Sequence, residues 1–151
     1  MVQQVTEQWL ADKPLQELIG RLHTEGCSCV IGNGNDIRSF WQRGVDDLLQ
    51  LYDTESGFLK GAAIADKILG RAAASLMIMG QVKWVYTDTL SRFALTFFEQ
   101  SDVEVYYRHL TEHVINRTGT DWCPLEKRCQ KCSTPMEAIV QIKEFKQNTS
   151  R

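Results

Sequence analysis

The chain has 151 residues, of which 43% are hydrophobic and 24% are charged, and its formal net charge is −2. These values are typical of one globular domain with a substantial core, and they argue against a general electrostatic attraction to nucleic acid or anionic membranes. We expect a single domain over residues 1–151, with residues 1–8 and 147–151 frayed.

The first residues lack the pattern of a secretory signal, and no apolar run is long enough to cross a bilayer. The five cysteines are therefore expected to be reduced thiols in a cytoplasmic protein.

The first third of the chain predicts a helix, a hairpin and a second helix. Leucine and isoleucine recur at helical spacing over residues 6–23, with Pro14 near the start. Two β-rich runs within residues 30–41 flank Asn33-Gly34, a dipeptide that favours a tight hairpin turn. Residues 45–52 place apolar side chains on one side of a short helix.

The middle of the chain begins with FLKGAAIADKILGRAAASLMIMG, residues 58–80, which predicts a long alanine-rich helix starting near Gly61. A strand over 82–86, a helix over 90–100 and a strand over 103–107 are expected next. Residues 115–132 read as irregular, and a last helix is predicted over 135–146. Strands joined through helices pair in parallel, so we predict a three-layer α/β fold with a mixed β-sheet, an N-terminal hairpin and parallel strands.

Four segments carry a resemblance to a known family: SCV at 28–30, RGV at 43–45, LKGAAIADKILGRAAA at 59–74 and NRTGTDWCPLE at 116–126. In these segments the chain resembles a small, uncharacterised prokaryotic family, a domain of unknown function with a cytidine deaminase-like fold. The resemblance implies that fold and no established activity.

Zinc deaminases hold their metal with a His or Cys, followed two positions later by Glu, and with a Pro-Cys-x-x-Cys motif. The stretches expected to correspond are LKGAAIADK at 59–67 and TDTLSRFAL at 87–95. Neither contains Cys, His or Glu, so zinc-dependent deamination is not expected, and the sequence identifies no cofactor.

The predicted helix after Gly61 offers one candidate ligand site. Its free backbone N–H groups and Lys60 would attract an anion, while Lys67 and Arg71 would share one helical stripe and face a phosphate. Asp66 would orient Lys67 or accept a hydrogen bond from a ligand hydroxyl. The alternative is a packed helix with one solvated stripe.

The run Asn116-Arg117-Thr118-Gly119 is a second candidate. Asn116, Arg117 and Gly119 could clamp a phosphate or a ribose, whereas the same residues are also common in an ordinary turn.

Three cysteines near the C-terminus leave three interpretations open. Cys123, Cys129 and Cys132 have spacing close to that of a metal site, although a fourth ligand is missing locally. Cys123 is alternatively a nucleophile with His109 or His113 as its base. The third interpretation is that all three are packed thiols.

We expect a deaminase-fold protein without the zinc site that binds a small nucleotide-like or phosphorylated ligand at the carboxyl ends of its parallel strands. One alternative is a thiol-dependent enzyme or a metal or redox site at Cys123, Cys129 and Cys132. Another is a non-enzymatic regulatory or interaction protein, in which the alanine-rich helix forms a homo-oligomer interface.

Overall fold

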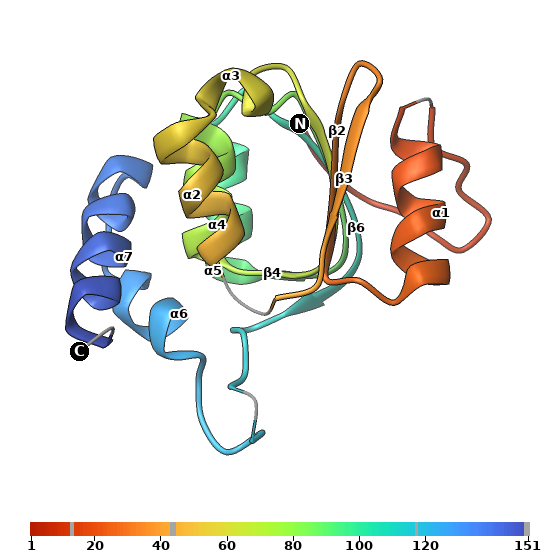
Figure 1. Cartoon of the computed structure of the whole chain (residues 1–151). Coiled ribbons are helices and arrows are strands. Elements are labelled where there is room, and N and C mark those ends of the chain that lie inside the picture. Colours follow the sequence, from red (N-terminus) through yellow and green to blue (C-terminus); the bar gives the residue numbers. More distant parts are fainter. Residues whose placement is uncertain (13, 43–44, 117, 150–151) are drawn as a thin grey trace.

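A single mixed sheet organises the molecule (Figure 1). The computed structural model describes residues 1–12, 14–42, 45–116 and 118–149. The strands of this sheet are β1 (Val2–Gln4), β2 (Cys29–Asn33), β3 (Asp36–Phe40), β4 (Ala63–Leu69), β5 (Trp84–Ser91) and β6 (Glu104–Thr111). Their spatial order is β1-β6-β5-β4-β2-β3. Strands β1, β6, β5 and β4 pair in parallel, whereas β2 is antiparallel to both of its neighbours, β4 and β3.

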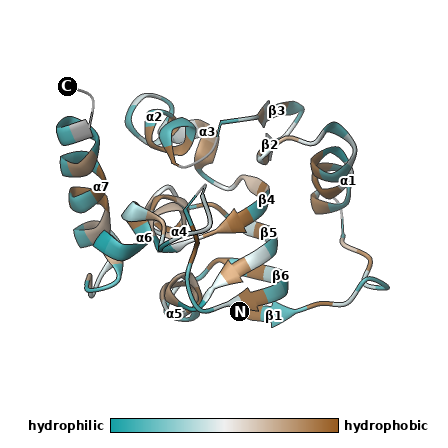
Figure 2. Ribbon diagram, turned by 90° about the horizontal axis from the view of Figure 1, so that it is seen from below, coloured by the Kyte–Doolittle hydropathy of each residue, from teal (hydrophilic) through white to brown (hydrophobic). Residues whose placement is uncertain are grey.

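Helices cover both faces of this sheet. They are α1 (Leu15–Glu25), α2 (Asp46–Thr54), α3 (Ser56–Leu59), α4 (Arg71–Met79), α5 (Arg92–Glu99), α6 (Pro124–Cys129) and α7 (Pro135–Thr149). In both views α1 lies on one face and the other helices lie on the opposite side, with α7 packed outside α4 (Figures 1 and 2). The predicted α/β class, the mixed sheet and the parallel strand–helix–strand units are therefore confirmed. None of the helices in the described ranges is both long and apolar enough to span a membrane.

The predicted hairpin is confirmed, but its turn lies one residue later than expected. Asn33 pairs with Asp36, so the two central residues are Gly34 and Asn35. Gly34 has a positive φ of 61°, which suits the first central position of a type II′ turn.

The predicted long helix over 58–80 is wrong. Residues Ala63–Leu69 form β4 in the interior of the sheet, between β2 and β5. After Gly61, where the helix was expected to start, only Arg71–Met79 are helical. The short side chains of Ala63 and Ala65 face the α1 side, where they allow α1 to pack closely on the sheet. Helix α4 is apolar around most of its circumference because the sheet lies on one side and α7 on the other.

Several boundaries also differ from the prediction. The first helix begins at Leu15 rather than near residue 6, and residues Val2–Gln4, expected to fray, pair with β6 as an edge strand. The segment expected to be irregular contains α6, and the last helix extends to Thr149. These differences arise because short helices and strands are stabilised by contacts with residues that are distant in the sequence, which local patterns do not reveal.

The sheet separates two apolar cores. The larger core lies between the sheet and helices α2, α4, α5, α6 and α7. The smaller core lies beneath α1 and includes Leu18, Leu22, Val30, Ala65 and Tyr86. The molecule therefore has two quite different faces on which a site could form.

Candidate functional site

The structure does not bring the predicted ligand-binding residues together. Lys60 and Gly61 precede the amino end of β4, whereas Arg71 follows its carboxyl end. A strand of this length spans roughly 20 Å, so Lys60 and Gly61 lie far from Arg71, at the opposite end of β4. Gly61 adopts a φ of 76° and its N–H donates to the carbonyl of Gln81 at 2.8 Å. It is a turn residue and not the start of a helix.

Asp66 and Lys67 face opposite sides of the sheet. Asp66 is 9% exposed, and its carboxylate lies near the backbone N–H groups of Ile68 and Lys67. Burial raises the pKa of this carboxyl to about 7. The Lys67 ammonium lies on the α1 side, where it donates to the carbonyl of Gly26 at 3.2 Å. Asp66 therefore does not orient Lys67.

Arg71 is buried and holds the α6 end against α5. Its guanidinium lies 4.0 Å from the centre of the Phe97 ring. Its acceptors are the Thr96 hydroxyl at 2.6 Å and the carbonyls of Phe93 at 2.8 Å, Cys132 at 3.0 Å, Gln130 at 3.1 Å and Cys129 at 3.5 Å. A ligand phosphate would have to replace these bonds before it could reach the guanidinium.

A carboxylate of the protein itself occupies the anion position at the start of α4. Glu126 is 2% exposed, and its two oxygens accept the backbone N–H groups of Arg71 and Val114, both at 2.8 Å. The side chain lies directly against Gly70, where an added Cβ would approach its oxygens to 3.1 and 3.2 Å. The N-terminus of this helix is thus already paired with a negative charge.

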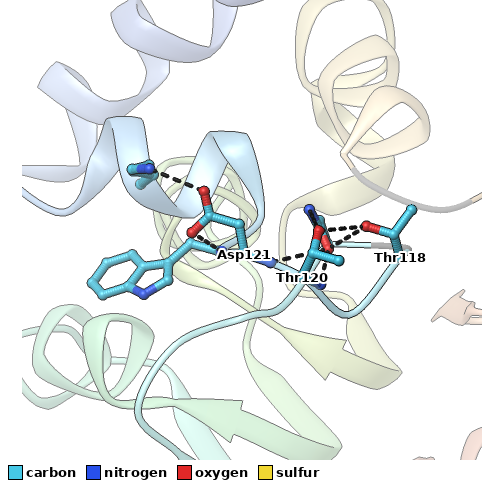
Figure 3. A network of polar contacts seen from close by, with 6 residues as sticks. Thr118, Thr120 and Asp121 are labelled. Carbon is cyan, nitrogen blue, oxygen red and sulfur yellow. Dashed lines mark hydrogen bonds and ion pairs between the residues drawn. The ribbon is translucent and has the colours of Figure 1, made fainter.

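The second candidate, the loop around Asn116, is held together by its own side chains (Figure 3). The Asn116 side-chain oxygen accepts the Thr118 hydroxyl and the Thr120 backbone N–H, both at 3.1 Å. Gly119 has a φ of 72°. Arg117 lies outside the described residues. These bonds are those of an Asx-type turn.

The C-terminal cysteines are packed around α6. Cys129 is fully buried, and burial raises the pKa of its thiol to about 12, while burial also raises the pKa of Cys132. Raised pKa values disfavour the thiolate, which is the form that attacks or binds metal. No group of three or more His, Cys, Asp or Glu side chains within the described part of the chain is arranged to hold a metal ion. Among the described residues, neither His109 nor His113 forms a hydrogen bond with Cys123, as a base that activates this thiol would.

A cavity of about 290 Å³ lies instead on the α1 face, which sequence analysis did not consider. It opens between α1, the middle of β5 and β6, and the segment that joins β1 to α1. Its lining residues are Val5, Thr6, Glu7, Trp9, Leu10, Ala11, Gln16, Ile19, Gly20, His23, Tyr86 and Arg108.

A hydrogen-bonded network of three side chains borders this cavity. Tyr86 and Asp88 are two positions apart on β5 and share the α1 face. The Tyr86 hydroxyl donates to one Asp88 oxygen at 2.5 Å, and the His23 imidazole lies 2.8 Å from the same oxygen. Burial, followed by the bond to Asp88, raises the pKa of Tyr86 well above its ordinary value. The network fixes the orientation of His23 at the cavity wall.

The cationic side chain of the cavity is Arg108, which β6 supplies. Its guanidinium interacts with the Tyr86 hydroxyl and forms an ion pair with Glu7 at 2.6 Å. Trp9 covers the same region, with its ring centre 4.9 Å from that of Tyr106 and 6.2 Å from that of Tyr86. The cavity thus combines aromatic walls, one guanidinium and one oriented imidazole.

No local motif identifies these residues, because four separate segments supply them. One usable signal was the placement of polar side chains inside strands. Tyr86 and Asp88 alternate on one strand, and Tyr106 and Arg108 alternate in the same way on the next. Because alternation in a strand places such residues on one face, they indicate a face that is not simply core.

The chain is therefore an α/β protein with a mixed six-stranded sheet and a small cavity with a polar and aromatic lining beneath a single helix. Residues 17–146 match the family model described as "TM1506: Domain of unknown function (DUF1893)". The chain therefore belongs to the DUF1893 family, which confirms the family part of the resemblance.

A crystal structure of a DUF1893 family protein (TM1506) from Thermotoga maritima is similar to this chain, with a TM-score of 0.82 and 20% sequence identity. The alignment covers 93% of this chain and 95% of the other. At this identity the similarity supports the fold alone. No curated protein matches the chain.

Proposed function

We propose that this protein binds a small planar anion in the cavity beneath α1. The observation that carries the proposal is the cavity itself, which has Trp9 and Tyr86 in its walls and the Arg108 guanidinium within reach. Apolar walls with a few convergent polar groups are typical of small-molecule sites. At about 290 Å³, the volume is at the lower end for such sites, so the ligand is small.

The chemistry of the lining defines the kind of ligand. Aromatic side chains favour a flat, polarisable molecule, and a guanidinium favours a carboxylate or phosphate, which it binds through two parallel hydrogen bonds. His23 supplies a further polar group whose orientation is fixed by Asp88. A nucleotide-like or phosphorylated ligand, expected from the sequence, belongs to this class of molecule but would bind at a different site from the one predicted.

The test is a binding titration with two nearly isosteric fluorescent probes, 2-aminobenzoate and the neutral 2-aminobenzamide, together with a nucleoside monophosphate and its nucleoside. The Trp9 indole N–H resonance and calorimetry report binding. We expect the anionic member of at least one pair to shift the Trp9 resonance and to bind more tightly than its neutral partner.

Two variants of equal charge change locate the binding. Arg108→Gln removes the guanidinium from the cavity, whereas Arg21→Gln changes an exposed arginine on α1 that pairs with Glu17. Loss of anion binding in Arg108→Gln alone supports the proposal. A wild-type protein that binds none of the four probes, or an equal loss in both variants, refutes it.

We also propose that the chain has a cytidine deaminase-like arrangement without the zinc site. The order helix, hairpin, helix and then β4-α4-β5-α5-β6 supports this arrangement. Because 59–67 is mainly strand, the residues to compare with the zinc motifs are those that open α2 and α4, WQRGVDDLL at 41–49 and ILGRAAAS at 68–75. Neither stretch contains Cys, His or Glu, so the expectation that zinc-dependent deamination is absent now depends on these residues.

A further inference from the structure

The two partners of the Glu7–Arg108 ion pair have very different surroundings. Arg108 has a side chain that is 25% exposed, lies on β6 and also interacts with Tyr86. Glu7 has a side chain that is 80% exposed and lies on the segment that joins β1 to α1. The cation is therefore a fixed part of the cavity wall, while its carboxylate partner reaches it from the solvent side.

We propose that Glu7 is a built-in competitor for the anion position of this cavity. In the ligand-free protein its carboxylate occupies the face of Arg108 that a ligand carboxylate or phosphate would use. Binding of an anionic ligand then displaces Glu7 into solvent. The inference rests on the proposed function, because it assumes that Arg108 recognises the ligand.

The exchange is chemically balanced. One carboxylate leaves the guanidinium as another anion arrives, so Arg108 stays paired throughout. The outgoing group is already mostly in water, and an exposed ion pair of this kind changes an equilibrium by only roughly two- to fivefold. An anion that also gains aromatic contacts can therefore displace Glu7 easily. A neutral ligand gains no ion pair with Arg108 by displacing it.

The rest of the segment can stay in place during this exchange. The backbone N–H of Val5 donates to the carbonyl of Tyr107 at 2.8 Å, and Trp9 stacks on Tyr106. These contacts hold the segment on both sides of Glu7. The competitor thus acts through one side chain, and it reduces the affinity for anions without closing the cavity.

The experiment compares Glu7→Gln with wild type in titrations of 2-aminobenzoate and 2-aminobenzamide. Glutamine keeps the length of the side chain but no longer forms an ion pair with Arg108. We expect Glu7→Gln to bind 2-aminobenzoate roughly two- to fivefold more tightly and 2-aminobenzamide with unchanged affinity. Glu17→Gln, which removes an exposed carboxylate of α1 that does not line the cavity, controls for the change in net charge and should leave both affinities unchanged.

The possible outcomes separate this inference from the proposed function. If 2-aminobenzoate binds in an Arg108-dependent way and Glu7→Gln does not strengthen it, the competitor role is refuted and the ligand site stands. An equal gain in Glu7→Gln and Glu17→Gln also refutes that role, because net charge then explains the effect. If neither wild type nor Glu7→Gln binds 2-aminobenzoate, the inference is refuted for this probe. If no probe of the panel binds either, the proposed function is also refuted.

Discussion

Replacing Asp66 with asparagine is expected to make the protein more stable at neutral and alkaline pH. Asp66 is 9% exposed on an interior strand, and burial raises its pKa from the ordinary 3.8 to about 7. Because the folded state holds the proton more tightly than the unfolded state, the free energy of unfolding falls as the pH rises from about 4 to about 7, and it levels off above that. The full effect of such a shift is up to about 4 kcal/mol. Asparagine does not titrate, and it keeps the size of the side chain and one oxygen acceptor.

The assay is urea denaturation of wild type and Asp66→Asn at several pH values between 5 and 9. The stability of the variant relative to wild type should increase by about 2 to 3 kcal/mol between pH 5 and pH 8 and change little beyond that. Asp102→Asn, at an exposed position between α5 and β6, is the matched control and should show no such trend. A pH-independent difference between Asp66→Asn and wild type would refute the argument, because it would mean that Asp66 is already ionised throughout this range.

Two further predictions concern the carboxylate at the start of α4. Glu126→Gln should lower the free energy of unfolding by about 2 to 4 kcal/mol, because one of the two bonded N–H groups would face an amide NH₂ instead of an oxygen. The control is Glu112→Gln, which removes one partner of an exposed ion pair and should lower the free energy of unfolding by less than about 1 kcal/mol. Gly70→Ala should destabilise by about 1 to 3 kcal/mol, because its Cβ would press on the Glu126 oxygens at 3.1 and 3.2 Å. Gly57→Ala in α3, which meets nothing within 4 Å, should instead be neutral or slightly stabilising, by up to about 1 kcal/mol. Thermal denaturation measures both pairs, and a Glu126→Gln or Gly70→Ala variant as stable as its control would contradict the role assigned to Glu126.

The clearest failure of sequence analysis was the assignment of residues 58–80 to one helix. Alanine has a high helix propensity and a low strand propensity, so local preference favours a helix through Ala63 and Ala65. The sheet overrides that preference because β4 pairs on both edges and because only small side chains let α1 approach its face. The sequence did contain one signal of the boundary between β4 and α4, namely Gly70. This glycine divides the segment into two runs, each of an ordinary length for a strand or a helix.

The hairpin and the parallel units were predictable because their signals are local. Gly34 supplies a positive φ at the turn, and neighbouring strands joined through a crossover helix, such as β4-α4-β5, pair in parallel. The cavity was not predictable in this way. Glu7, His23, Tyr86 and Arg108 come from four segments, and only the three-dimensional arrangement of α1 over β5 and β6 brings them together.

The carboxyl edge of the parallel strands is where open α/β sheets usually bind ligands, and in this chain much of that edge is occupied from within. Glu126 neutralises the start of α4, and the guanidinium of Arg71 is used to hold the carbonyls at the end of α6. An anion entering there would have to remove a buried carboxylate and leave Arg71 N–H groups to find new partners, which costs several kcal/mol before any contact is gained. On the α1 face the equivalent exchange removes only the exposed side chain of Glu7 from Arg108. The difference in cost between these two exchanges favours the cavity beneath α1 as the place where this fold admits a ligand.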